Sequence, residues 1–217
     1  MGAIRAAELR ALPRFRLSPE VTLYRIYPCC WPLAPSPSSA VVPGVPAWFC
    51  GEGDHRFDFP RGNAGTCYLS TSETGAVIEV FERGALHEAG AGQRRLAVLT
   101  VRRPVEVLDL TGSADAGEGS IVSRILGERG PIGGHDAYEF SQRFAWDLFC
   151  QGISGVKWLS CRDPDRKSEN LAIFRARSGA DAGSVFRVDQ TRELCRVLIT
   201  SVGESLCESR RLDSVAR

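Results

Sequence analysis

The sequence predicts one domain of the α+β class. Strand-like and helix-like segments interleave along the 217 residues, without the regular β–α–β alternation of a doubly wound sheet. Hydrophobic residues make up 43% of the chain, enough to bury one good core at this length. We therefore expect a single domain over 1–217, with a core at about 20–175, an N-terminal arm at 1–19 and a C-terminal extension at 176–217.

The first fifty residues divide by composition. Residues 1–19 predict a basic, partly helical arm. Residues 21–27 are rich in Thr, Val, Tyr and Ile, which predicts a strand. Residues 28–46 contain six prolines, so no regular structure is expected there, and so long a loop is usually functional or disordered.

Short strands and helices follow in turn. The hydroxyl residues at 70–72 offer an N-cap for a helix at about 73–83. A short helix is expected at 121–126, and Phe140, Phe144 and Leu148 recur at helical spacing within 137–150. The expected strands are 66–69, 95–101, 105–110, 156–159, 171–174 and, less regular, 194–200.

The charge balance restricts the kind of partner. Lys and Arg total 27 against 26 Asp and Glu, a formal charge of +1, which argues against binding to nucleic acid or to a membrane surface. No apolar run is long enough to span a bilayer, and the arginine-containing N-terminus is unlike a secretory signal. We expect a cytoplasmic protein.

The eight cysteines do not form a disulfide framework or a metal site. They are scattered, without a CxxC pair, and His55, His87 and His135 stand apart from them. Reduced, mostly buried thiols and no bound metal are expected.

The segment from Gly51 to Phe81 carries the most specific signal. It sets Arg56 in a polar loop and Tyr68 on a short apolar run, and places Glu79 between two apolar residues on either side. A buried, unpaired carboxylate costs several kcal/mol, on the order of a whole protein's marginal stability, so Glu79 needs a partner. Arg56 or Arg25 could supply it. Such a group of residues suits an anionic ligand that contains a sugar.

Five segments in order resemble the RES domain family, the toxin half of Xre–RES toxin–antitoxin modules. The resemblance covers roughly residues 20–175. One departure is Asp58, where the family usually has Asn. The matching segments are Leu23-Tyr24-Arg25, His55-Arg56-Phe57-Asp58, Gly65 to Ser70, Ala76 to Phe81, and Gly155 to Ser160 continuing through Leu171 to Phe174.

The resemblance implies an ADP-ribosyltransferase-like fold, a split mixed or antiparallel sheet with flanking helices. It also implies an enzyme that consumes NAD as substrate, without a further cofactor, by breaking the bond between nicotinamide and ribose. A Xre-type antitoxin is the implied protein partner, and a homodimer stays open. The catalytic residues would be Glu79, Arg56 and Ser160, and the NAD-binding residues Arg25, Arg56, Tyr68 and Tyr24.

The residue chemistry agrees with a single carboxylate. Nicotinamide leaves as a neutral molecule from a cationic ring, so no acid needs to protonate it, and a carboxylate stabilises the ribosyl cation that remains. Guanidinium groups bind pyrophosphate bidentately, and a tyrosine ring can stack on nicotinamide. Ser160 would position Glu79 or the ribose and would not act as nucleophile, because no histidine stands in a triad-like context.

Each residue also has a purely structural interpretation. Glu79 and its arginines could be an ordinary ion pair, Tyr68 a core aromatic and Ser160 the start of a turn. Three functions therefore stay open. They are NAD cleavage by water or phosphate, mono-ADP-ribosylation of a protein, and a RES-fold binding module that has lost catalysis, with Asp58 as the sign of that loss.

Overall fold

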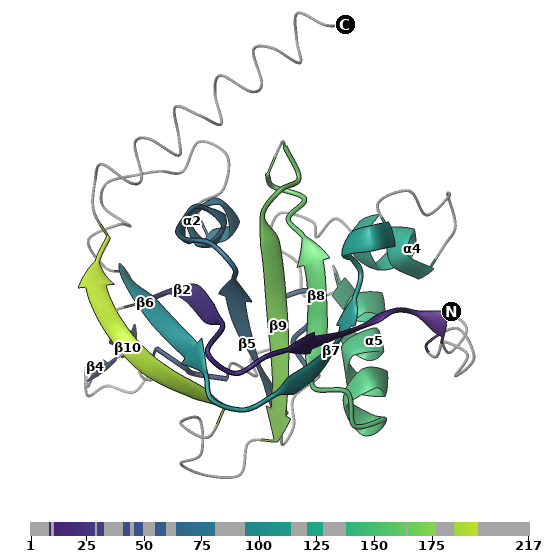
Figure 1. Ribbon diagram of the computed structural model, residues 1–217, viewed down its shortest axis with the longest axis horizontal. Coiled ribbons are helices and arrows are strands. Elements are labelled where there is room, and N and C mark those ends of the chain that lie inside the picture. Colours follow the sequence, from purple (N-terminus) through teal and green to yellow (C-terminus); the bar gives the residue numbers. More distant parts are fainter. Residues whose placement is uncertain are drawn as a thin grey trace, which may run out of the picture.

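In the computed structural model, eight strands form one mixed sheet (Figure 1). The structure describes residue 9 and residues 11–28, 30–32, 41–43, 46–49, 55–59, 64–80, 94–113, 121–127, 138–163, 165–176 and 185–194. The strand order is β1-β7-β8-β9-β5-β2-β6-β10, and only β7 and β8 run parallel. The strands are β1 (Arg14–Leu17), β2 (Thr22–Pro28), β5 (Ala64–Ser70), β6 (Arg94–Val101), β7 (Val105–Asp109), β8 (Gly155–Leu159), β9 (Glu169–Ala176) and β10 (Phe186–Glu193).

The sheet is nearly split between β2 and β5. These two strands share one residue pair in register, Tyr24 with Ser70. By contrast, β2 and β6 are paired from Thr22 to Pro28, and β5 and β9 from Ala64 to Ser70. Two half-sheets, β1-β7-β8-β9-β5 and β2-β6-β10, therefore meet at a single point. The predicted α+β class, with a split mixed sheet, is confirmed.

The two faces of the sheet pack against different parts of the chain. Side chains alternate along each strand, so residues in register share a face. The helix face carries Tyr24, Tyr68, Ser70, Trp158 and Asn170, together with α2 (Glu73–Val80), α4 (Ile121–Gly127) and α5 (Glu139–Cys150). The opposite face, which we call the inner face, packs Leu23, Cys67, Leu99, Leu171 and Phe186 from both half-sheets into one cluster.

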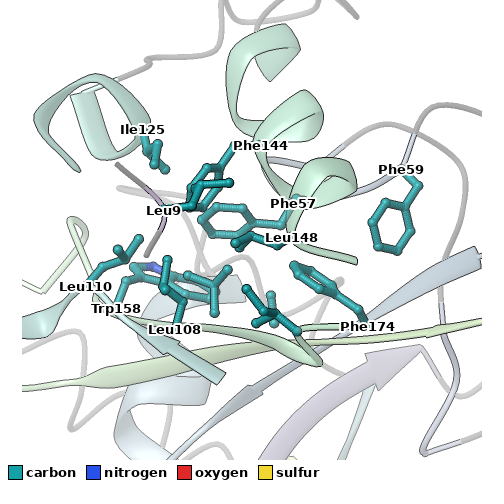
Figure 2. Packing of buried hydrophobic residues seen from close by; sticks show 14 of the residues in the cluster. Leu9, Phe57, Phe59, Leu108, Leu110, Ile125, Phe144, Leu148, Trp158 and Phe174 are labelled. Atoms are coloured by element: carbon teal, nitrogen blue, oxygen red, sulfur yellow. The ribbon is translucent and has the colours of Figure 1, made fainter. Parts of the chain in front are cut away.

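An aromatic core fixes α5 on the helix face (Figure 2). Phe57 lies between Phe144 of α5 and Trp158 of β8, with its ring centroid 5.0 Å from that of Trp158. Phe59 packs in the same way against Phe174 of β9, at 5.1 Å. Full burial of such side chains contributes roughly 1.5–3 kcal/mol each. This packing ties the short segment 55–59, which contains Arg56, to the sheet.

Most expected elements are present, but three regions contain strands that were not expected. The N-terminal arm is helical at Leu9 and Ala11, as expected, but it also contributes the unexpected strand β1, which pairs with β7. The Pro-rich segment contains a two-stranded hairpin of β3 (Cys30–Pro32) and β4 (Val41–Pro43). The C-terminal extension supplies β10, an edge strand paired with β6, although no strand was expected at 186–193. The strand expected at 194–200 lies outside the described residues after Leu194.

The cysteine prediction holds only in part. Cys67, Cys150 and Cys161 are free thiols, but Cys67 alone of these three is buried, and the other two are exposed. Within the described ranges no group of His, Cys, Asp and Glu side chains is arranged to hold a metal ion. No helix in that part of the chain is long and apolar enough to cross a membrane.

Candidate active site

The N-terminal turn of α2 fixes the helix against the sheet. Ser72 is the N-cap, since its Oγ accepts a hydrogen bond from the Gly75 backbone N–H at 3.0 Å. Gly75 permits a close approach, because a Cβ there would lie 2.3 Å from Ser70 Oγ and 3.2 Å from Ser168 Cβ. Glu79 follows four residues later and so lies on the same side of the helix as Gly75. The packing of Gly75 thereby turns Glu79 toward the ends of β5, β8 and β9.

The two carboxylate oxygens of Glu79 have different surroundings. Oε2 accepts hydrogen bonds from Ser160 Oγ at 2.7 Å and from Asn170 Nδ2 at 2.8 Å. Oε1 faces Arg162 Nε at 3.9 Å, too far for a hydrogen bond, and the Glu79 side chain is 30% exposed. Among the described residues, one oxygen is therefore held by two donors, while the other is left for a solvent molecule or a ligand.

Arg162 is the arginine that the structure brings to Glu79. Its NH1 donates to the backbone carbonyl of Glu79 at 2.5 Å, and its guanidinium forms the ion pair with the carboxylate. The expectation that Arg25 or Arg56 pairs with Glu79 was wrong for the described part of the chain. A half-exposed guanidinium beside a half-exposed carboxylate forms a polar site that a charged ligand can enter.

The turn between β8 and β9 holds Ser160 and Arg162 in place. Ser160 N–H donates to the Ser168 carbonyl at 2.8 Å, and the carboxylate of Asp163 accepts from three backbone N–H groups. Burial opposes ionisation of Asp163, but hydrogen bonding from the Ser168 side chain and from these backbone N–H groups outweighs it, and the pKa of the carboxyl is lowered. Asp163 therefore stabilises the turn in its ionised form. The three donors are the backbone N–H groups of Asp165, Lys167 and Ser168.

Tyr68 lies on the same face as the Glu79 cluster. It is two residues before Ser70, which pairs with Asn170, so its Cα is about 7 Å along the strand from that pair. Its ring makes edge contacts with Trp158, at 6.5 Å between centroids, and with His55, at 5.6 Å. Tyr68 is partly buried, and its ring is supported by the buried Trp158 on the face of the sheet that carries Glu79.

Asp58 organises the loop that carries Arg56. Its carboxylate is fully buried and accepts from Tyr68 Oη at 3.0 Å and from His55 N–H at 3.0 Å, and Tyr68 Oη accepts from Phe57 N–H at 2.9 Å. The hydroxyl of Tyr68 is thus used by the fold, and only its ring is offered to a ligand. The acidic residue at this position has a structural role that does not by itself indicate loss of catalysis.

Arg56 and Tyr24 also belong to the helix face. Arg56 NH1 donates to the Ile125 carbonyl in α4, and its guanidinium lies over the Tyr138 ring at 5.0 Å. Tyr24 is half-buried against the cluster that contains α2. The structure therefore places Tyr24, Arg56, Tyr68, Glu79 and Ser160 on one side of the sheet.

Arg25 lies on the other side. It is the neighbour of Tyr24 in an extended strand, so its side chain points to the inner face. There NH1 donates to the Trp48 carbonyl and to Cys67 Sγ, the latter at 2.7 Å. Burial raises the pKa of the Cys67 thiol even though Arg25 opposes the rise. The expected grouping of Arg25 with Tyr68 and Glu79 in one binding surface was wrong, because strand alternation places the Arg25 side chain on the inner face.

A family model of the RES domain matches residues 22–195. The chain belongs to the RES domain family. The matched range extends past the core expected from sequence and includes β10, in agreement with its pairing in the sheet. No curated protein matches the chain in sequence.

One solved structure with a similar fold is the crystal structure of the M. tuberculosis MbcT–MbcA toxin–antitoxin complex. The identity is 17%, and the alignment covers 87% of this chain and 92% of that chain, with a TM-score of 0.48.

Two residues of the site were not foreseen. Asn170 and Arg162 both contact Glu79, yet in sequence they only mark the two ends of a polar turn. The available signal was the position of that turn directly after Ser160. Because the strand after the turn pairs with the strand before it, the two ends of the turn lie close together. Nothing in residue type or spacing separated these two from the other polar residues of the turn.

Proposed function

We propose that this RES domain cleaves NAD between nicotinamide and ribose. The C1′–N bond breaks, its electron pair stays on the departing nicotinamide, and a ribosyl oxocarbenium ion remains. Attack of water on C1′ gives ADP-ribose and releases one proton to solvent. With phosphate as the acceptor, a phosphate ester of ADP-ribose forms at the same carbon.

The arrangement around Glu79 carries this proposal. With Oε2 held by Ser160 and Asn170, the negative charge is fixed in direction before the reaction begins, so little reorganisation is needed as the cation forms. Oε1 is available to accept a hydrogen bond from a ribose hydroxyl. If Glu79 and Arg162 formed only a structural ion pair, the fold would not need to leave Oε1 without a hydrogen bond.

The neighbouring side chains supply the other contacts that NAD requires. The Tyr68 ring, supported by Trp158, would pack against the flat nicotinamide. Arg56 is held near Tyr68, because the N–H of the next residue, Phe57, donates to Tyr68 Oη. We assign binding of the pyrophosphate to the Arg56 guanidinium. Arg25, on the inner face, is left out of the proposed contacts.

Exposure of Glu79 favours a small acceptor. Its side chain is 30% exposed, so water and phosphate have direct access to the region of the anomeric carbon. We also propose the toxin role that RES family membership implies, with NAD depletion in the cytoplasm restrained by a Xre-type antitoxin.

The test is release of nicotinamide from NAD by the purified chain, with Glu79→Gln as the matched variant. The wild type should release nicotinamide and ADP-ribose, and Glu79→Gln should be slower by about 10³-fold, the size of effect seen when one electrostatic stabiliser is removed. The exposed Glu106 of β7 gives a control, Glu106→Gln, which should behave as wild type. No loss of NAD in water, in phosphate or with added protein would overturn the proposal, and label transferred to protein would change it to a transferase.

A further inference from the structure

Asn170 is a buried polar residue of the site, and half of its amide is unsatisfied. The residue is 1% exposed and lies at the start of β9, between Ser70 of β5 and Trp158 of β8. Its Nδ2 donates to Glu79 Oε2 at 2.8 Å, but its Oδ1 is buried and has no hydrogen-bond partner. Within the described residues no other buried side-chain polar atom is left unpaired.

The orientation of this amide is fixed by chemistry. Turning it over would place Oδ1 against Glu79 Oε2, two acceptors without a proton between them. The donor must therefore face the carboxylate, and the acceptor is left buried without a partner. No rotation of the side-chain amide satisfies both ends.

Stability does not account for an amide at this position. A hydrogen bond to a charged group and the desolvation of an orphaned carbonyl are of similar size and opposite sign. An apolar side chain of the same shape would avoid the orphan altogether. Glu79 itself does not require Asn170 for solvation, because Ser160 binds the same oxygen and the carboxylate reaches solvent.

We propose that Asn170 is a positioning residue for Glu79. Ser160, which directly follows β8, and Asn170 of β9 both donate to Oε2, and two donors on one oxygen fix both the position and the rotation of the carboxylate. The result is that Oε1 points to the open side. The effect of Asn170 on catalysis rests on the proposed function. Its effect on the orientation of the Glu79 carboxylate does not.

The first test compares Asn170→Leu with wild type. The variant should keep or raise Tm, because it removes the orphaned acceptor, and should lower kcat by roughly tenfold to a hundredfold with little change in KM, as expected when a reacting group is misplaced. Thr100→Val is the control, since it removes one buried hydroxyl of β6 that bonds Asp189 of the edge strand β10, and it should keep wild-type kcat. An unchanged kcat in Asn170→Leu, or a fall in kcat that parallels a loss of folded protein, would overturn the proposal.

The second test uses pH. In Asn170→Asp two carboxyl groups would lie at hydrogen-bond distance, with Arg162 as the other charged group at Glu79. Like charges so close share a proton, so at acidic pH the protonated Asp donates to Glu79 as the amide did, and as pH rises both ionise and repel. Activity relative to wild type should therefore recover at acidic pH and fall as pH increases. A ratio that does not vary with pH would overturn the positioning role.

A structural readout separates this inference from the proposed function. In crystals of Asn170→Leu the Glu79 carboxylate should turn away from its wild-type orientation at Ser160. If the wild type cleaves no NAD but the carboxylate turns, the proposed function fails and the positioning role stands. If the wild type cleaves NAD and the carboxylate does not turn, the positioning role fails and the proposed function stands.

Discussion

The polar clusters around Glu79 and around Arg25, on opposite faces of the sheet, differ in nearly every physical respect. On the helix face, Glu79 is half-exposed and one of its oxygens is left open. On the inner face, Arg25 is buried and its NH1 is used by a backbone carbonyl and a thiol of the described residues. The first cluster keeps free capacity for a ligand, and the second uses its capacity to join Trp48 to β5.

The difference shows how strand alternation separates neighbours in sequence. Tyr24 and Arg25 are adjacent, yet one contributes to the site face and the other to the opposite core. The type of a polar residue does not show whether its side chain binds a ligand or supports the fold. What distinguishes them is whether donors and acceptors are already paired.

The largest expected effect that tests this comparison is on the inner face. Arg25→Leu removes the donor to the Trp48 carbonyl and to the buried Cys67 Sγ, and should lower the free energy of unfolding by about 1–3 kcal/mol, the cost of polar groups left unpaired. Activity per folded molecule should change less than twofold. Chemical denaturation and nicotinamide release give the two values. If Arg25→Leu kept wild-type stability but lost activity, Arg25 would instead be an NAD-binding residue.

A smaller effect is expected on the helix face. Ser160→Ala removes one of the two donors to Glu79 Oε2 and should lower kcat by roughly tenfold, with unfolding changed by less than about 1 kcal/mol. Steady-state kinetics and thermal unfolding measure these effects. If Ser160 only began the turn after β8, stability would fall and kcat of the folded fraction would not.

The smallest effect concerns the turn that supports the site. The lowered pKa of Asp163 means that the ionised carboxyl stabilises the fold at pH above about 4, and that this contribution is lost as pH falls below that value. Asp163→Asn should therefore reduce stability by about 1 kcal/mol at pH 7, and the difference from wild type should vanish near pH 2. Unfolding followed across pH measures it. A difference independent of pH would assign the effect to packing.

Much of the fold could be predicted from sequence because its signals are local. The apolar runs at 66–69, 95–101 and 156–159 lie within β5, β6 and β8, and helical spacing located α5. β10 could not be found in this way. It is an edge strand with one buried residue out of eight, so its sequence lacks the alternation that identifies a half-buried strand.

The site, like the fold, could be predicted only where its signals are local in sequence. Glu79 was singled out because a carboxylate amid apolar residues needs partners, and Ser160 is one of them. The other partners, Arg162 and Asn170, lie 83 and 91 residues away in sequence. No local rule identifies which distant donors meet a given carboxylate, because that depends on strand register and on the seating of α2 by Gly75.

The amino-acid sequence by itself determined the class of fold, the family and the carboxylate around which the site is built. These follow from composition, periodicity and the order of short motifs, all of which are properties of neighbouring residues. Only the tertiary structure decided which arginine meets Glu79, which face Arg25 occupies and which oxygen is left open. Those features depend on long-range pairing of strands, since a shift of one residue in register would exchange the two faces of the sheet.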